Sequence, residues 1–375
     1  MSTIEMAPGT ATELASVETT PQDVEDLAGR LFIETVGALH LASVYVGVRH
    51  NLFKEVDDHG PLTADELAKR TGLDRRYLSE WLRAEAVAGL LRTDDVDPLV
   101  GRFWSGPAIA EVLVDETGQA YSGSLPALLT AGFGVLPTLV DAFRSGDGVP
   151  YPAYGEEAVS AQSAMTRPAY QNDLIPDWIS MMPGVADLLG DTARPALVAD
   201  IGCGTGWAAI RLALAYPHLR VDGFDTDETS IAAARRNAAE SGVADRVSFD
   251  VVDSGDDYGQ ARYDVVFFFE CLHDMAQPVA ALRQARAAVT ERGSVIVMDE
   301  AVTEDLGVGD PLQSLFASCS LIWCTPQGLV EPGSQVVGTV MRPQRMAELA
   351  REAGWSGTED LPIEHPFWRF YELVR

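Results

Sequence analysis

From Ala196 onwards, short apolar runs alternate with segments that carry apolar residues at helical spacing. Such alternation predicts strands joined by helices, the pattern of an α/β domain with a parallel sheet. The fourth run, YDVVFFFE, is almost entirely apolar, which is typical of a strand that helices cover on both faces. We expect strands in ALVADIG, RVDGFD, RVSFDVVD, YDVVFFFE and GSVIVMDE, followed by a closing hairpin of LPIE and FWRFYELV.

A glycine-rich turn follows the first expected strand and reads DIGCGTGW over residues 200–207. Its glycines allow a sharp backbone turn and a close approach to a ligand. Trp207 stands where the GxGxxG fingerprint of dinucleotide-binding proteins has its third glycine, which argues against NAD. The sequence contains no GxxxxGK[ST] motif, so a P-loop nucleotide site is excluded as well.

Acidic residues end the next three expected strands. Asp225 ends the second strand, where a carboxylate can accept hydrogen bonds from both hydroxyls of a ribose. Asp253 and Ser254 end the third strand, where they would meet an adenine edge, and Glu270 ends the fourth. Because open α/β sheets bind ligands at the carboxyl ends of their strands, we expect these residues at one site.

These residues together resemble the cofactor site of class I S-adenosylmethionine-dependent methyltransferases. The resemblance covers residues 196–375 and implies a Rossmann-like α/β domain with a seven-stranded sheet and S-adenosylmethionine as cofactor. It implies that Asp225 holds the ribose and that Asp253 and Ser254 lie beside the adenine. The methionine part would be surrounded by Asp200, Gly202, Gly204 and Gly206. The other cofactor-binding candidates are Cys203, Thr205, Thr226 and Glu270.

The N-terminal part predicts a mainly helical winged-helix domain over residues 23–105, after a disordered tail at 1–22 rich in Thr, Ser and Pro. Thr63 can cap one short helix, which Gly72 ends, and Asp74 can cap a second. LLRT and RFWSG then form a β-wing. Between residues 65 and 92 the basic side chains are nearly cancelled by acidic ones, whereas a DNA reader presents a basic face. We therefore expect packing and dimerisation, not nucleic-acid binding.

The whole chain also resembles a group of actinobacterial methyltransferases with such a domain. This group is related in layout to small-molecule O-methyltransferases that dimerise through the winged helix. The resemblance therefore implies a homodimer and a small-molecule acceptor.

Two segments are candidates for the acceptor pocket. Residues 106–195 predict a helical linker that contributes Tyr154, Tyr170 and Trp178. The insertion at about 302–340 is too long for a simple connection, and Trp323 within it would offer a flat apolar wall. These aromatic residues predict an aromatic or otherwise apolar acceptor, although core packing is the alternative for each of them.

His273 and Asp274 follow the fourth expected strand on the cofactor side of the sheet. His273 is the candidate general base, because an imidazole titrates near ~6.5 and small-molecule O-methyltransferases resemble this sequence in having a base His followed by Asp here. Asp274 would then orient the imidazole. The alternative is that Asp274 caps the following helix and no proton is transferred. No metal is expected, because no second His is fixed nearby by the sequence.

Composition narrows the remaining choices. The formal net charge of -29 favours a neutral or cationic small-molecule acceptor over nucleic acid or an anionic membrane. No apolar run approaches the roughly 20 residues of a membrane span, and the N-terminus lacks the features of a signal peptide. Since none of the four cysteines forms a CxxC pair, we expect a reduced, cytoplasmic protein.

The sequence therefore predicts a small-molecule O-methyltransferase of secondary metabolism. Three alternatives stay open at this point: a C- or N-methyltransferase that needs no base, a DNA-binding regulator that senses S-adenosylmethionine, and a non-methylating enzyme that has repurposed the cofactor.

Overall fold

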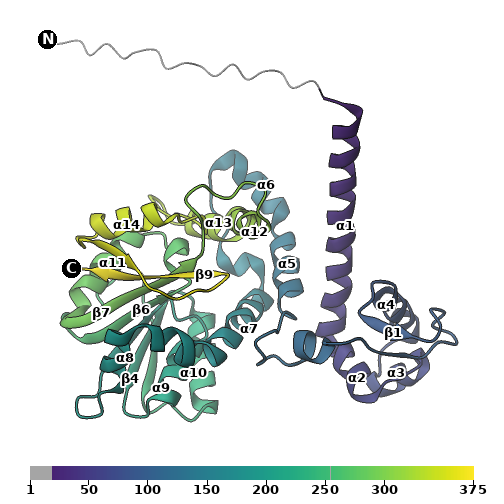
Figure 1. Ribbon diagram of the computed structural model, residues 1–375, viewed down its shortest axis with the longest axis horizontal. Coiled ribbons are helices and arrows are strands. Elements are labelled where there is room, and N and C mark those ends of the chain that lie inside the picture. Colours follow the sequence, from purple (N-terminus) through teal and green to yellow (C-terminus); the bar gives the residue numbers. More distant parts are fainter. Residues whose placement is uncertain (1–18, 254) are drawn as a thin grey trace.

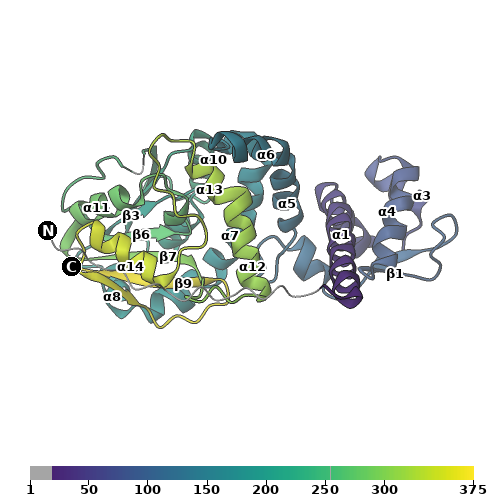
Figure 2. The ribbon, with the colours of Figure 1, turned by 90° about the horizontal axis from the view of Figure 1, so that it is seen from above.

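The computed structural model describes residues 19–253 and 255–375. The described chain forms a small N-terminal lobe and a larger C-terminal lobe, with the long helix α1 (Pro21–Arg49) standing between them (Figure 1). Seen from above, α1 lies between α4 (Arg75–Val87) of the small lobe and α5 (Leu125–Gly134) of the large one (Figure 2). The predicted tail at 1–22 falls mostly outside the described residues, and the first helix already begins at Pro21, two residues before its expected start.

The small lobe has the predicted winged helix-turn-helix. Thr63 and Glu66 form a capping box at the start of one helix, which ends at Gly72 in the left-handed conformation with φ +71. Asp74 accepts hydrogen bonds from two backbone amides at the start of the next helix. The two wing strands pair antiparallel, with Leu91 opposite Ser105. The elements are α2 (Leu52–His59), α3 (Ala64–Thr71), α4 (Arg75–Val87), β1 (Leu91–Thr93) and β2 (Phe103–Ser105).

Helix α1 leaves a wide apolar surface uncovered. Phe32 is 66% exposed and Leu39 is 69% exposed. By length and apolar composition α1 could cross a membrane, as could the bent pair α5 (Leu125–Gly134) and α6 (Leu136–Ser145) taken together, and the apolar part of α1 is largely exposed. The expectation that no segment reaches that length and apolar character is therefore wrong for α1.

A helical segment leads from the small lobe into the large one, as the sequence predicts. Helix α7 contacts both α5 and α9 (Trp207–Ala215), the helix that follows the glycine-rich turn. The elements are η1 (Ala110–Val114), α5 (Leu125–Gly134), α6 (Leu136–Ser145), η2 (Tyr151–Tyr154), α7 (Glu156–Asn172), η3 (Leu174–Trp178), η4 (Ile179–Met181) and α8 (Pro183–Gly190).

Within the described residues, seven strands form one sheet in the order β5-β4-β3-β6-β7-β9-β8. The strands β3 to β7 are parallel, and β9 runs antiparallel to both of its neighbours, β7 and β8, which confirms the predicted seven-stranded α/β fold. The strands are β3 (Leu197–Ile201), β4 (Arg220–Asp225), β5 (Val247–Val251), β6 (Tyr263–Phe269), β7 (Val289–Glu300), β8 (Gly357–Asp360) and β9 (Trp368–Val374).

The closing hairpin differs from its prediction in its first strand. Strand β8 covers GTED and not LPIE, which lies in the connection to β9. Gly357 pairs with Val374 and Asp360 with Tyr371, so this polar edge strand is defined by its partner. The prediction chose LPIE because its apolar residues alternate. Leu361 and Ile363 do pack against the core, but from the connection and not from a strand.

Helices cover both faces of the sheet, and β6 is buried throughout. One face packs against α8, α9 and α10, and the other against α11 and α14. The helices are α9 (Trp207–Ala215), α10 (Glu228–Glu240), α11 (Pro278–Ala288) and α14 (Pro343–Glu352). The long insertion forms α12 (Pro311–Cys319), η6 (Ser320–Cys324) and α13 (Thr325–Gly328) over the carboxyl end of the sheet.

Candidate active site

A cavity of about 510 Å³ opens at the carboxyl ends of β3, β4, β5 and β6. Its floor is the glycine-rich turn and the strand ends that the sequence predicts, and residues of α7 form one side. The roof consists of residues 150–152 and 327–331. A backbone hydrogen bond of 2.8 Å from Val149 to Pro326 joins the two roof segments. This volume lies within the range of small-molecule sites.

Positive backbone dihedrals shape the glycine-rich turn. Gly206 has φ +83, and a Cβ atom there would lie 2.5 Å from the ring of Phe249. Gly202 has φ +69, and a Cβ atom there would lie 2.5 Å from Cβ of Cys271. Only glycine combines a positive φ with the absence of a Cβ atom, so these two positions require it. The turn can then lie with its backbone along the floor of the cavity.

Asp225 accepts two backbone hydrogen bonds, one on each carboxylate oxygen. The amide of Gly204 donates at 2.8 Å and the amide of Asp227 at 2.9 Å. Burial raises the pKa of Asp225, although these bonds oppose the rise. Each carboxylate oxygen retains acceptor capacity, so the side chain can also accept the hydroxyls of a ribose.

Two carboxylates near the first and fourth strand ends each have one oxygen without a partner. Oδ2 of Asp200 and Oε2 of Glu270 have no hydrogen-bond partner among the described residues. Burial raises the pKa of each carboxyl to about 7. A cationic ligand in the cavity would favour ionisation of Glu270, which lies on the wall, and at longer range that of Asp200, which does not. The ammonium and sulfonium of S-adenosylmethionine therefore suit this donor set.

The predicted site residues fall into two groups. The following lie on the cavity wall: Gly202, Cys203, Gly204, Thr205, Asp225, Thr226, Asp253, Glu270, Asp274 and Tyr170. The following do not: Asp200, Gly206, His273, Tyr154, Trp178 and Trp323. Ser254 lies outside the described residues.

The aromatic candidates serve mainly as packing. Tyr154 and Trp323 stack on each other with ring centroids 4.4 Å apart, and the Tyr154 hydroxyl donates to the carbonyl of Ile322. Trp178 is buried under the sheet against Phe370. Tyr170 alone of the four reaches the cavity, because α7 turns that face inward.

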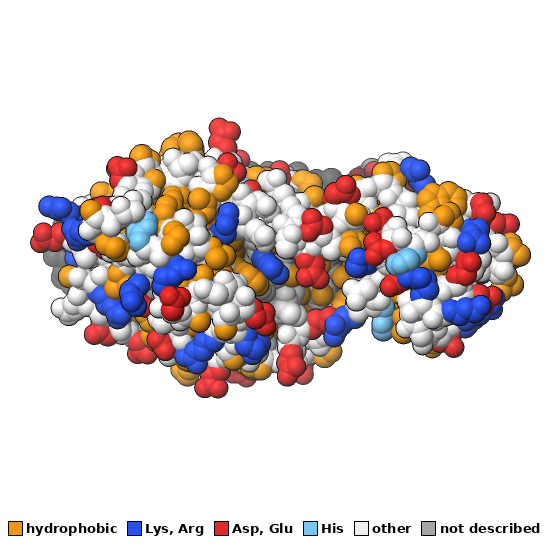
Figure 3. Space-filling model, turned by 90° about the horizontal axis from the view of Figure 1, so that it is seen from below, with side chains coloured by type: hydrophobic (Ala, Val, Ile, Leu, Met, Phe, Trp, Pro, Cys, Tyr) orange, Lys and Arg blue, Asp and Glu red, His pale blue; other side chains and the backbone are white. Residues whose placement is uncertain are grey.

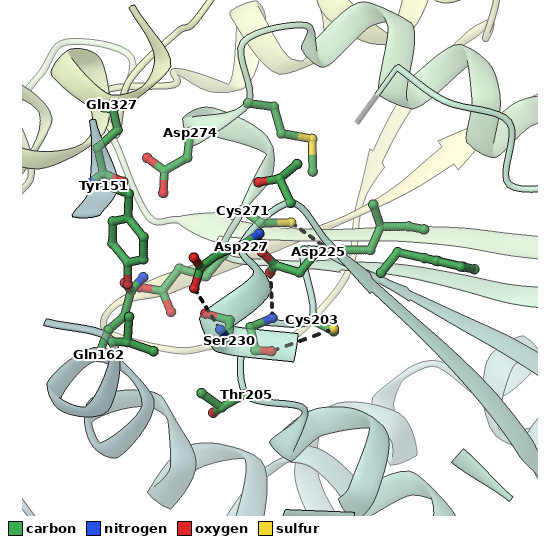
Figure 4. A pocket seen from close by; sticks show the side chains of 18 of the residues that line it. Tyr151, Gln162, Cys203, Thr205, Asp225, Asp227, Ser230, Cys271, Asp274 and Gln327 are labelled. Carbon is green, nitrogen blue, oxygen red and sulfur yellow. Dashed lines mark hydrogen bonds between the residues drawn. The ribbon is translucent and has the colours of Figure 1, made fainter. Parts of the chain in front are cut away.

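Sequence reasoning missed several cavity residues. Tyr151 lies in the roof and donates a hydrogen bond of 3.1 Å to Gln162 of α7 (Figure 4). Val159, Gln162, Thr166 and Tyr170 share one helical face, and their spacing of three or four residues could have identified it. No comparable signal marks Gln327, which faces the same end of the cavity from the insertion (Figure 4).

His273 and Asp274 lie in the short 3-10 helix η5 (Leu272–Asp274) after β6. Helix α11 begins at Pro278, and Gln277 precedes it without a side-chain cap. The capping role considered for Asp274 is therefore wrong, because Met275 and the residues after it separate η5 from the helix.

Carboxylates surround the imidazole of His273, which is 2% exposed. Nδ1 lies 2.8 Å from Oδ1 of Asp299 and 3.1 Å from Oε2 of Glu300, and Nε2 lies 3.2 Å from Oδ1 of Asp274. Burial lowers the pKa of His273, but Asp274, Asp299 and Glu300 together raise it well above its ordinary value.

The same cluster includes groups of the kinds that bind metals. Ligand atoms of His273, Asp299 and Glu300 lie within 4.8 Å of one another, as do those of His273, Asp274 and Cys324. Ion pairing explains the set of His273, Asp299 and Glu300 without a metal, because a protonated imidazole supplies the positive charge that balances the carboxylates. The expectation that no metal takes part stays a prediction.

Comparisons with known proteins agree with this geometry. Residues 196–354 match the family described as a methyltransferase domain, and residues 37–98 match the Rv2258c-like winged HTH domain. The chain is 29% identical to the 27-O-demethylrifamycin SV methyltransferase of Amycolatopsis mediterranei over 61% of its length and 74% of that protein. It is also 29% identical to the acetylserotonin O-methyltransferase of Mus musculus over 70% of each.

A solved structure extends the similarity to the whole fold. Human N-acetylserotonin methyltransferase in complex with S-adenosylmethionine superposes with a TM-score of 0.65, at 17% identity, over 92% of this chain and 97% of that one. The glycine-rich turn, the acidic strand ends and the domain matches all agree. The chain is therefore an S-adenosylmethionine-dependent methyltransferase of the class I fold that carries a winged-helix domain before its methyltransferase domain.

Proposed function

We propose that this methyltransferase transfers the methyl group to a hydroxyl oxygen of a small aromatic or apolar molecule of secondary metabolism. One observation carries the choice of oxygen: a carboxylate backed by an imidazole, Asp274 with His273, stands on the cavity wall beyond the cofactor residues. A hydroxyl acceptor loses a proton during transfer, whereas many carbon and nitrogen nucleophiles need no base. The names of the two curated relatives, both of which methylate small molecules, support this proposal.

The cofactor-binding assignments follow the strand ends. Asp225 and Thr226 would hold the ribose, and Asp253 would lie beside the adenine. Glu270 would face the cationic methionine part, while Asp200, which is not on the cavity wall, would act on it only through its charge. Gly202, Cys203, Gly204, Thr205 and Gly206 would bring their backbone against it. When bound, S-adenosylmethionine supplies a methyl group on a sulfonium, activated for in-line displacement. The residues of the chain then orient the acceptor and exclude water.

The acceptor would lie under the roof. Tyr151, Gln162 and Gln327 surround the end of the cavity where Asp274 stands (Figure 4), and Tyr170 bounds it from α7. Tyr151 offers an apolar ring face, and the two glutamines offer hydrogen bonds. The stacked pair of Tyr154 and Trp323 would stiffen the roof from behind without contacting the acceptor.

A DNA-binding regulator is disfavoured by the surface of the winged helix. On α4, Arg76 and Arg83 both pair with Glu80, and Arg75 pairs with Asp65 of α3. In Figure 3 the basic side chains of this lobe are intermingled with acidic ones. Internal pairing of this kind leaves little net charge for phosphate contacts.

We also propose that the protein is a homodimer formed through α1. The uncovered stripe consists of Val24, Leu27, Leu31, Phe32, Val36 and Leu39. These exposed apolar residues lie on the N-terminal part of a 29-residue helix that stands clear of both lobes at that end (Figure 1). An exposed patch of this length is typical of an interface. Because Asp26, Arg30 and Glu34 interrupt the opposite face, a second copy suits it better than lipid.

The four cysteines are all free, in keeping with the cytoplasm.

The test is transfer of a labelled methyl group from S-adenosylmethionine into a metabolite extract of the host, analysed by mass spectrometry. The expected result is a labelled small-molecule methyl ether. The matched control is Asp225→Ala, which keeps the acceptor end intact and should give no product. A label on carbon or nitrogen would contradict the proposed oxygen chemistry.

A further inference from the structure

We propose that Ser163 of α7 and Thr205 of the glycine-rich turn form a hydroxyl pair that donates a hydrogen bond to the carboxylate of the cofactor's methionine part. Ser163 is not part of any site that the sequence predicts. The inference concerns the cofactor, so it goes beyond the proposed O-methyl transfer and does not depend on which acceptor atom is methylated. It rests on the proposed placement of the methionine part at the glycine-rich turn.

The cavity wall offers carboxylates to a cation but no charged partner to an anion. The charged residues on the wall are Asp225, Asp227, Asp253, Glu270, Asp274 and Glu331. No Lys or Arg from residues 19–253 or 255–375 lies among them. The methionine part carries both an ammonium and a carboxylate. Glu270 can face the ammonium, whereas the carboxylate needs neutral donors, because an anion buried without hydrogen bonds is unfavourable.

Three side chains meet where α7 packs against the turn and α9. Oγ of Ser163 lies 2.6 Å from Oγ1 of Thr205, and Nε1 of Trp207 donates to the same Ser163 oxygen at 3.0 Å. All three residues lie on the cavity wall. The side-chain amide of Asn237 in α10 donates to the backbone carbonyl of Thr205 at 3.0 Å, which helps to hold the turn in place.

The protons of this pair leave one donor for a ligand. Each hydroxyl has one proton, and the bond between Ser163 and Thr205 uses one of the two. Trp207 cannot accept the other, because an indole N–H only donates. None of the described residues accepts it either, so the hydroxyl that retains this proton can donate it to a ligand oxygen in the cavity.

Two other hydroxyls near α7 are already engaged. The Thr166 hydroxyl donates to the backbone carbonyl of Gln162 at 3.4 Å. The Tyr151 hydroxyl donates to the side chain of Gln162 at 3.1 Å. The pair of Ser163 and Thr205 is therefore the better placed donor at the turn.

Positive charge lies behind the pair. Cζ of Arg167 lies 3.9 Å from the centroid of the Trp207 ring, and Nε of Arg167 has no hydrogen-bond partner among the described residues. Helix α9 begins at Trp207, and the N-terminus of a helix favours a negative group. In Figure 4, Thr205 lies at the opposite end of the view from Asp274. This end of the cavity therefore suits the carboxylate of the cofactor and not the acceptor.

Isothermal titration of the full-length protein with two ligands tests the pair. S-adenosylhomocysteine has the carboxylate, whereas methylthioadenosine has the same nucleoside and a thioether but lacks both the ammonium and the carboxylate. The double variant Ser163→Ala with Thr205→Val removes both hydroxyls and changes the shape little. We expect its affinity for S-adenosylhomocysteine to fall about 10- to 100-fold, the contribution of one hydrogen bond to a charged group. Its affinity for methylthioadenosine should not change.

The matched control is Ser163→Thr with Thr205→Ser, which exchanges the two side chains and keeps both hydroxyls. It should bind both ligands as the wild-type protein does. If the variant without hydroxyls does not fold, Ser163→Cys with Thr205→Val takes its place, because a thiol fills the position of the Ser163 hydroxyl and is only a weak donor.

This inference and the proposed O-methylation fail in different ways. A label on carbon or nitrogen in the transfer experiment would overturn O-methylation and leave the binding result standing. Wild-type affinity of the double variant for S-adenosylhomocysteine would overturn the role of the pair. An equal loss of affinity for both ligands would also overturn it, since the two hydroxyls would then only shape the turn.

Discussion

The backbone amide of Gly204 donates a hydrogen bond of 2.8 Å to Oδ2 of Asp225, and this bond ties the glycine-rich turn to the end of the neighbouring strand. The two residues are 21 positions apart: Gly204 lies in the connection after β3, and Asp225 is the last residue of β4. One carboxylate thus holds the turn in place and also faces the cavity. Cofactor binding and the shape of the turn should therefore depend on the same side chain.

The first prediction is that Asp225→Ala abolishes measurable cofactor binding. Charge-assisted hydrogen bonds to the two ribose hydroxyls contribute roughly 1.5–3 kcal/mol each, so their loss weakens affinity about 10²–10⁴-fold. Isothermal titration with S-adenosylhomocysteine measures this directly. Asp225→Asn retains one acceptor oxygen and should lose less affinity than Asp225→Ala. An unchanged affinity in Asp225→Ala would refute the ribose assignment.

The second prediction concerns Gly206→Ala. A Cβ atom would lie 2.5 Å from the Phe249 ring, and the residue would remain at φ +83, which costs about 1–3 kcal/mol for a residue other than glycine. We expect a lower melting temperature and weaker cofactor binding. Gly242→Ala is the control for positive φ alone, since φ is +72 there and nothing lies within 4 Å of its Cβ position. Equal effects in both variants would show that the contact with Phe249 is unimportant.

The third prediction is that the cofactor stabilises the protein more at about pH 8 than at about pH 6. Burial raises the pKa of Asp200 and of Glu270 to about 7, above the unfolded values of 3.8 and 4.5. An acid whose pKa is higher in the folded protein than in the unfolded chain makes folding less favourable as it ionises. Without cofactor, the protein therefore loses stability as the pH rises from the unfolded pKa values to about 7. A bound cationic cofactor stabilises the ionised carboxylates and so offsets this loss of stability at high pH. At lower pH the carboxyls are protonated, and the cofactor gains less from them.

Thermal unfolding with and without S-adenosylmethionine, across that pH range, measures the effect. The shift in melting temperature should grow with pH in the wild-type protein and should be flatter in Glu270→Gln. A shift that is independent of pH would argue against a cationic group beside these two carboxyls.

The fourth prediction is that Phe32→Asp and Leu39→Asp each convert the dimer to a monomer. Both side chains lie on the exposed apolar stripe of α1, and a charge there would be buried between two copies. Sedimentation velocity reads the mass. Arg30→Asp, on the polar face of the same helix, should leave the dimer intact. A wild-type protein that sediments as a monomer would contradict the proposed interface.

Local signals in the sequence were sufficient for much of the fold. Thr63 and Asp74 identify their helices because a capping side chain bonds within three residues. Asp225, Asp253 and Glu270 were brought to one cavity because the carboxyl ends of parallel strands share an edge.

Features that depend on distant packing were not predictable in this way. Tyr154 bonds to the carbonyl of Ile322, 168 residues away, and this contact turns its ring to Trp323 and away from the cavity. The order of His273 and Asp274 along the chain says nothing of which one faces the ligand. That depends on Asp299 of β7, which draws the imidazole beneath the wall.

The most direct test of the central claim is the labelled methyl transfer, with the wild-type enzyme and Asp225→Ala side by side in the same host extract. The account predicts one labelled small molecule in the wild-type sample, with the label on an ether oxygen, and none in the variant. A wild-type enzyme that binds S-adenosylmethionine but labels no small molecule, or labels one on carbon or nitrogen, would contradict it.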